Sequence, residues 1–325
     1  MNAPRAAACA VLATLVAGCA ATDDAGRRSA EIDSSAPVAT DQRIPLAMRL
    51  FEEGRDEQAR AIVDDILVRD PNHPRADVAL FIAAECRLRS GRLDEAYQQY
   101  VRLIERHPAS RVTRAVPARL YRLGVLLLER EPATLIEQLA PSFALAIDAF
   151  SRVAIDFPGS EWSDDAWMKL GEAHLKEGRP DYAALAFDRL ARERRDSEFA
   201  EEACWRVAPA LERKSRDAKC DVIPLADARR AAVRYLKRYG EHGRFAAEAG
   251  ALIRTTTERL ADHERNIAAF YARGGNGPAA ALHTNNADRL LGSDPDGPDS
   301  LDLLRERFDR PPWERDRPLP PLLDD

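Results

Sequence analysis

The apolar positions between residues 44 and 274 recur at the spacing of amphipathic helices, and one arrangement of residues returns along this stretch. Each copy has a small residue, an apolar residue four positions later and a helix-stopping residue twelve positions after the small one. The copies are Ala59-Val63-Pro71, Ala96-Tyr100-Pro108, Ala146-Phe150-Pro158, Ala183-Phe187-Arg195 and, more loosely, Ala228-Ala232-Gly240. In the fourth copy Arg195 takes the place of the proline. This recurrence indicates an internal repeat.

Glycine and alanine mark two further positions of each repeat. Gly54, Gly91 and Gly178 lie five residues before the repeat alanine, where they predict a turn between two helices, and Ala84, Gly124 and Gly171 lie in the middle of the preceding helix. Helices whose axes lie about 8–10 Å apart need small side chains where they cross. A proline cannot continue a helix, so it ends the second helix of the pair. This is the tetratricopeptide pattern of about 34 residues per helix-turn-helix unit.

The pattern predicts an all-α fold, a tetratricopeptide-repeat solenoid over residues 44–274 with about five helix-turn-helix units and a long C-terminal helix. The units are expected at residues 44–74, 77–110, 115–160, 163–196 and 198–242, the long helix at 244–273, and insertions at 130–141 and 213–225. Each unit can bury its apolar face only against a neighbour, so we expect one right-handed superhelix with a single concave groove.

Composition supports helices and excludes some functions. The chain is 45% hydrophobic but only 6% aromatic, which suits Ala- and Leu-rich helices better than a β-sandwich. Its formal net charge is -6 with both signs interspersed. The sequence therefore shows no basic footprint for nucleic acid and no polybasic membrane patch.

The first residues have the pattern of an export signal. Arg5 is followed by an apolar run over residues 6–17, which is too short to span a bilayer. The run ends in Val16-Ala17-Gly18-Cys19, which resembles a bacterial lipobox. We expect residues 1–18 to be a lipoprotein signal peptide and Cys19 to be the lipidation site. The alternative is an ordinary secretory signal with a chance cysteine.

The lipid would fix the protein to a membrane without spanning it. Several tens of acyl CH₂ groups at roughly 0.8 kcal/mol each make release negligible. Ala20 follows the cysteine, and its resemblance to lipoprotein sorting signals favours the outer membrane, with the protein facing the periplasm. Residues 19–43 lack apolar periodicity and predict a flexible tether, and residues 275–325 predict a weakly structured Pro-rich tail. Both termini of the chain are thus expected to be disordered.

Cysteines remain after removal of the signal at Cys86, Cys204 and Cys220. The bacterial envelope is oxidising, so a disulfide between Cys204 and Cys220 is one possibility and isolated buried thiols are the other. The spacing does not distinguish them.

Residues 143–274 resemble the outer-membrane assembly lipoproteins of the YfiO/BamD family. One matching segment runs from Ala146-Ile147-Asp148-Ala149-Phe150 through Phe157-Pro158-Gly159-Ser160 to Asp165-Ala166. The more specific one comprises Tyr235-Leu236-Lys237-Arg238-Tyr239, then Leu260-Ala261, Glu264, Ile267-Ala268, Tyr271 and Gly274. The chain departs from the family in two ways: it has about two additional repeats ahead of this region, and after Gly274 only one weak helix and the Pro-rich tail follow.

The resemblance implies a periplasmic scaffold in the assembly and insertion of β-barrel outer-membrane proteins. Its partners would be the barrel-forming assembly subunit and unfolded outer-membrane protein clients. A second hypothesis is a similar lipoprotein that coordinates cell-wall synthesis or outer-membrane constriction. A third is an envelope hydrolase with a site in one of the insertions.

The sequence offers little for catalysis. The six histidines show no metal-ligand spacing, and neither a phosphate-binding loop nor a G-x-S-x-G element is present. The acidic pairs Asp64-Asp65 and Glu201-Glu202 are expected on solvated helix faces. We therefore predict a protein that is not an enzyme and has no cofactor, no metal and no small-molecule substrate.

The first helix of each tetratricopeptide unit lines the concave surface, so its other positions are candidate contacts with an extended apolar peptide. These protein-binding groove candidates are Met48, Phe51, Phe81, Arg89, Tyr121, Val125, Met168 and Glu172. The alternative is that they pack between neighbouring helices. Trp313 lies among prolines in the tail, where either a partner-docking motif or a solvated segment is possible.

Overall fold

The computed structural model describes residues 40–130, 143–217 and 222–292. Within these ranges the chain forms twelve α-helices, one short 3-10 helix and no strand, which confirms the predicted all-α class. The chain divides into two compact units between Ala166 and Trp167. The continuous solenoid over residues 44–274 stays a prediction.

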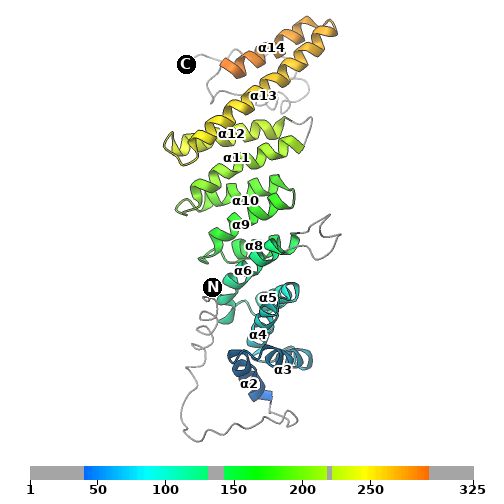
Figure 1. Cartoon of the computed structure of the whole chain (residues 1–325), viewed down its shortest axis with the longest axis vertical. Coiled ribbons are helices and arrows are strands. Elements are labelled where there is room, and N and C mark those ends of the chain that lie inside the picture. Colours follow the sequence, from blue (N-terminus) through cyan, green and yellow to red (C-terminus); the bar gives the residue numbers. More distant parts are fainter. Residues whose placement is uncertain (1–39, 131–142, 218–221, 293–325) are drawn as a thin grey trace, which may run out of the picture. The chain divides into compact units, whose positions relative to one another are not determined.

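The first unit contains successive helical pairs (Figure 1). They are α2 (Thr40–Glu52) with α3 (Asp56–Arg69), α4 (Ala76–Arg89) with α5 (Leu93–Arg106), and α6 (Val116–Glu129) with α8 (Ala144–Asp156), where the 3-10 helix η1 (Val112–Ala115) precedes α6. Helix α9 (Ser163–Lys176) begins at the end of this unit.

The second unit holds most of α9 together with α10 (Pro180–Glu193), α11 (Ala200–Asp217), α12 (Ile223–Tyr239), α13 (Ala246–Arg273) and α14 (Gly277–Gly292). Helices α10 to α14 pack consecutively, each against the next (Figure 1). The five predicted helix-turn-helix units and the long helix are all present. Of the predicted insertions, residues 131–141 and 218–221 lie outside the described residues. Residues 213–217 and 223–225 of the second predicted insertion belong to helices α11 and α12, so the prediction of an insertion is wrong there.

The repeat residues lie where the spacing predicted. All five repeat alanines and the apolar residue one turn after each are buried: Ala59 and Val63, Ala96 and Tyr100, Ala146 and Phe150, Ala183 and Phe187, Ala228 and Ala232. Four of the second helices end two residues before the stop position, whether that position is proline or Arg195. The interhelical turns use Gly54, Gly91 and Gly178 at φ values of 77°, 77° and 75°, a left-handed conformation that glycine adopts without steric cost.

Close helix crossings explain two other glycines. A Cβ atom on Gly124 of α6 would lie 2.8 Å from Cε1 of Phe150, and one on Gly171 of α9 would lie 2.3 Å from Cε1 of Phe187. Both phenylalanines are completely buried, which stabilises the folded state by roughly 1.5–3 kcal/mol per side chain. The glycine leaves the space that each ring fills.

The expectation that residues 275–325 form a weakly structured tail is wrong for residues 277–292. Helix α14 packs along α13, and its Ala287 and Leu290 share a buried cluster with Leu260 of α13 and Leu225 of α12. The rest of the tail, with Trp313, lies outside the described residues, as do Cys19 and the signal and tether up to residue 39.

Candidate functional site

Four of the eight groove candidates are core residues. Met48, Phe51, Phe81 and Met168 are exposed by only 5%, 2%, 1% and 6%. Phe81 makes an edge-on ring contact with Tyr100, at a centroid distance of 6.4 Å. For these four the prediction of a peptide contact is wrong, because a neighbouring helix already covers the position on the first helix of the pair.

Arg89 is held against one of these core residues. Its guanidinium carbon lies 3.8 Å from the centroid of the Phe51 ring. Its Nη1 atom donates hydrogen bonds to Oδ1 of Asp56 at 2.9 Å and to the Phe51 carbonyl at 3.3 Å. Arg89 therefore connects α4 to the turn between α2 and α3. Its side chain remains 33% exposed.

Tyr121 and Val125 are the partly exposed candidates on α6. The Tyr121 ring lies 5.8 Å from the Phe150 ring and 5.0 Å from the Trp162 ring, measured between centroids. Within this aromatic group Tyr121 stays partly exposed, as does Val125 one turn further along the helix. In the first unit, these two residues are the apolar groove candidates that stay accessible.

Glu172 belongs to the second unit and bridges two helices. Its carboxylate accepts hydrogen bonds from Nζ of Lys169 and Nη1 of Arg206, each at 2.8 Å. Burial alone raises the pKa of Glu172, but these hydrogen bonds and charges outweigh burial and hold the pKa below its ordinary value. Glu172 is thus charged at neutral pH and partly open to solvent.

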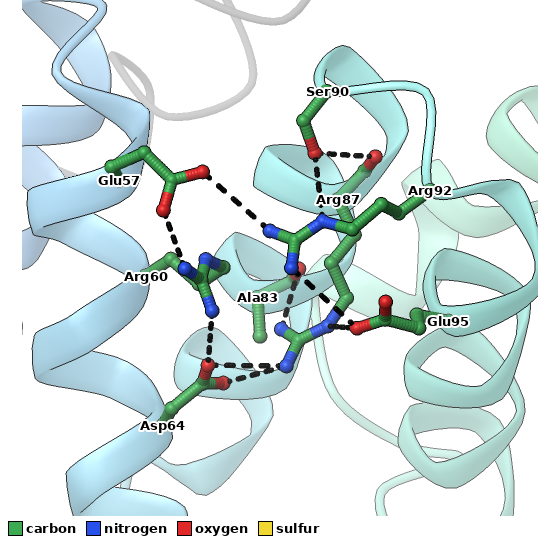
Figure 2. A network of polar contacts seen from close by, with 8 residues as sticks. All are labelled: Glu57, Arg60, Asp64, Ala83, Arg87, Ser90, Arg92 and Glu95. Carbon is green, nitrogen blue, oxygen red and sulfur yellow. Dashed lines mark hydrogen bonds and ion pairs between the residues drawn. The ribbon is translucent and has the colours of Figure 1, made fainter.

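A charged network that the sequence did not predict joins α3, α4 and α5 (Figure 2). At its centre the nearly buried guanidinium of Arg87 donates to both carboxylate oxygens of Asp64 at 3.0 and 3.1 Å. It also donates to Oε2 of Glu95 at 3.1 Å and to the Ala83 carbonyl at 3.1 Å. Arg87 therefore ties three helices together.

Two further arginines complete the network in Figure 2. Arg60 contacts Glu57 and Asp64 on its own helix, and Arg92 lies 3.6 Å from Glu57 and 3.8 Å from the Glu95 carboxylate. With Arg87, three arginines face three carboxylates, so the charges balance. We infer that the network stabilises the packing of the first unit.

The acidic pairs expected on solvated faces instead make contacts between helices. Asp64 binds Arg87 of α4, and Asp65 pairs with Arg43 of α2. In the second unit, Oε1 of Glu201 accepts hydrogen bonds from the Tyr235 hydroxyl at 2.7 Å and from the Arg244 amide at 2.6 Å. The prediction of a purely solvated role is therefore wrong for both pairs.

Tyr235 organises one part of the second unit. Besides donating to Glu201, its hydroxyl accepts a hydrogen bond from the Phe245 amide at 2.8 Å. Its ring makes edge contacts with those of Trp205 and Phe245 and a tilted contact with that of Tyr239. Burial and the neighbouring Glu201 carboxylate raise the pKa of Tyr235 to about 12, so the hydroxyl keeps its proton.

Part of the more specific matching segment lies on α13, and we call its residues from Leu260 to Tyr271 the signature residues. They lie on the side of α13 that α14 covers. Leu260 and Ala261 pack against α14. The buried Glu264 carboxylate lies 2.7 Å from Nδ1 of His283 and accepts a hydrogen bond from the Asn286 amide at 3.2 Å. Tyr271 stacks on His283 at a centroid distance of 5.6 Å. These residues share the task of docking α14.

The remaining predictions concern thiols, metals and membranes. Cys86 and Cys204 are buried free thiols, whereas Cys220 lies outside the described residues. Among the described residues no group of three or more histidine, cysteine or acidic side chains could hold a metal ion. No helix of the described ranges combines the length and apolar character needed to cross a membrane.

Comparison with known families identifies the repeat. Residues 136–289 match the model of the YfiO family, described as outer membrane lipoprotein, and residues 78–110 match a tetratricopeptide-repeat model. The YfiO match extends beyond the residues 143–274 expected from the sequence and includes most of α14. The comparison with curated proteins gave no match.

Solved structures resemble the chain only distantly. A tetratricopeptide repeat protein from Parabacteroides merdae is 15% identical with a TM-score of 0.34, covering 82% of this chain and 96% of the other. PilF of Pseudomonas aeruginosa is 16% identical with a TM-score of 0.28, covering 83% and 97%. PilW, described as a widely conserved type IV pilus biogenesis factor, is 18% identical with a TM-score of 0.28, covering 80% and 97%.

The repeated helical pairs, with glycine and alanine at their crossings, define a tetratricopeptide-repeat protein. Proteins of the matched families are generally non-catalytic scaffolds. Within this class of proteins, residues 136–289 match the model of the YfiO family of outer membrane lipoproteins.

Proposed function

We propose that this protein is a non-catalytic scaffold that binds other proteins during the assembly and insertion of β-barrel proteins in the outer membrane. The observation that carries the proposal is the YfiO match over residues 136–289, in which the signature residues have a shared structural role in docking α14. A stack of helical pairs offers an extended surface to a partner and needs no cofactor to do so.

The proposal includes a lipid anchor at Cys19, with residues 19–43 as the tether between the membrane and the helices. A full-length chain carrying Cys19→Ala should move from the outer-membrane fraction to the soluble periplasmic fraction. The helical content of the purified variant should be unchanged, because residue 19 precedes the first described helix. Retention of Cys19→Ala in the membrane fraction would contradict the anchor.

The proposed binding surface of the first unit uses the accessible groove candidates Arg89, Tyr121 and Val125. Glu172 stays a separate candidate contact of the second unit. Val125→Glu places a charge one helical turn from Tyr121 and should weaken binding of unfolded barrel strands. Val68→Glu is the matched control, because Val68 is 80% exposed on α3, the second helix of a pair. Equal affinity of the two variants for a barrel-derived peptide, measured by fluorescence anisotropy, would contradict a groove at α6.

Partners distinguish this function from its alternatives. After crosslinking in intact cells, purification of the full-length protein from membranes should recover the barrel-forming assembly subunit. Recovery of cell-wall enzymes in its place would assign the protein to cell-wall synthesis or outer-membrane constriction. Turnover of an envelope polymer by the purified chain, abolished by one substitution in the 130–141 or 213–225 segment, would make it a hydrolase.

A further inference from the structure

Residues 102–122 form a basic stretch in a chain whose net charge is -6. The stretch contains six arginines and one acidic residue, Glu105. It comprises the end of α5, the following turn, η1 and the first turns of α6. This charge therefore belongs to the repeats that precede residues 136–289, the part of the chain that matches the YfiO model.

Three of these arginines follow one face of a nearly continuous helical segment. Arg111 has helical backbone angles, φ -64° and ψ -34°, and leads directly into η1 and α6. Residues three, four or seven positions apart lie on the same side of a helix, so Arg111 and Arg114 are aligned with Tyr121. Val125 continues this line one turn later, and Arg122 lies beside it. All three arginines are exposed.

Helix electrostatics do not explain the first two arginines. The start of a helix carries a partial positive charge, which favours acidic side chains and disfavours basic ones. Helices α3, α4 and α5 of the same unit have acidic residues in their first turns, whereas α6 has none and is preceded by Arg111 and Arg114. These positive charges oppose the helix dipole, so their presence calls for another reason.

The carboxylates that contact this segment or lie within the basic stretch have other partners. Asp77 accepts a hydrogen bond from the Ser110 hydroxyl, and the buried Glu85 accepts one from Nε of Arg119 at 2.7 Å. Glu105 lies 3.5 Å from an arginine of α8. In the part of the chain that the structure describes, the three exposed arginines of the η1–α6 face form no ion pair. The face can therefore receive carboxylates from a partner.

The arrangement fits an extended protein segment that is acidic in its first half and apolar in its second. Guanidinium groups bind carboxylates through paired hydrogen bonds, while Tyr121 and Val125 are partly exposed and suit apolar side chains. The rise from Arg111 to Val125 is about 23 Å, which about seven residues of extended chain span. An anionic membrane fits less well, because the arginines form one narrow line and the chain as a whole is acidic.

We propose that the η1–α6 face binds an acidic segment of a partner protein. Carboxylates of the segment lie at Arg111, Arg114 and Arg122, and its apolar side chains lie at Tyr121 and Val125. This inference rests on the proposed function, because it names the chemistry of the segment that the binding surface of the first unit holds.

A labelled synthetic peptide, with glutamates in its first half and alternating valine and threonine in its second, tests the contact with the full chain by fluorescence anisotropy. Arg111→Glu/Arg114→Glu should weaken binding about tenfold, because two ion pairs are replaced by repulsion. Arg254→Glu/Arg273→Glu changes the net charge equally at exposed positions of α13 and should leave the affinity unchanged. Equal affinity of the two variants, or no binding of the peptide by the unaltered chain, overturns the proposal.

Urea unfolding separates a binding role from a structural one. Arg111→Glu/Arg114→Glu places acidic side chains at the start of a helix, so the unfolding midpoint should not fall although peptide binding is weakened. A lower midpoint than that of the unaltered chain would mean that the two arginines hold the fold, which overturns the proposal.

Two comparisons distinguish this inference from the proposed function and from lipid binding. If Val125→Glu weakens binding of the barrel-derived peptide but Arg111→Glu/Arg114→Glu leaves binding of the acidic peptide unchanged, the groove stands and the acidic partner is refuted. If only the arginine variant weakens binding of its peptide, the partner is acidic and the groove for barrel strands fails. Binding of phosphatidylglycerol vesicles that the arginine variant loses, without binding of the acidic peptide, assigns the face to lipid and overturns the proposal.

Discussion

Gly171→Ala isolates the physical reason for the repeat pattern. The added methyl group would lie 2.3 Å from Cε1 and 2.4 Å from Cζ of Phe187. The Phe187 side chain is completely buried, so the ring cannot move aside into solvent. Either the ring or one of the two helices has to shift.

The cost follows from two opposing effects. Overpacking of a filled core destabilises by about 1–3 kcal/mol, and the better helix propensity of alanine returns about 1 kcal/mol. Gly171→Ala should therefore lower the free energy of unfolding by up to about 2 kcal/mol. Gly250 of α13 is the control, because the nearest atom to its added Cβ is Nη1 of Arg254 at 3.6 Å. Gly250→Ala should stabilise by up to about 1 kcal/mol.

Urea unfolding followed by circular dichroism measures both variants, and Phe187→Leu supplies the test of mechanism. A smaller side chain at position 187 relieves the clash, so Gly171→Ala should be less costly in the Phe187→Leu background than alone. If Gly171→Ala raised the unfolding midpoint as much as Gly250→Ala does, the close crossing of α9 and α10 would be refuted.

Three further predictions concern buried polar groups. Tyr235→Phe removes the hydroxyl between Glu201 and the Phe245 amide and should lower the unfolding free energy by about 1–3 kcal/mol in urea titrations; an unchanged midpoint would contradict this. Burial lowers the pKa of His174 below 6.5. The neutral His174 side chain therefore makes its full contribution to the free energy of unfolding above pH 6.5, and this contribution is lost as the pH falls through the folded-state pKa. His174→Phe should flatten this acid-side decline, and an equally steep decline in both proteins would count against burial of a neutral imidazole. Burial raises the pKa of Cys86 to about 12, so iodoacetamide at mildly alkaline pH should modify this thiol slowly in the folded protein and fully in urea, as mass spectrometry can show.

The sequence predicted only part of the candidate site. The helical register identified the first helix of each pair but did not separate its two faces, so Phe51 and Phe81 were assigned to the groove although helices cover them. The sequence did not predict the Arg87 network, because an arginine in a helix is ordinarily exposed. No local signal indicates that Arg87 contacts Asp64, which lies 23 residues earlier in the chain. This ion pair could have been predicted only from a pattern that relates residues far apart in the sequence.

The sequence by itself determined the elements: where helices begin and end, where they cross closely, and that they pair. These properties depend on residues within one turn or one hairpin, such as a proline twelve positions after an alanine or a glycine with positive φ. The tertiary structure alone decided which side chains are covered and which carboxylates find an arginine. It also decided that α14 packs on α13 through Glu264, His283 and Leu290. Such contacts join residues far apart in the chain, and burial is a property of the neighbours on every side and not of the residue itself.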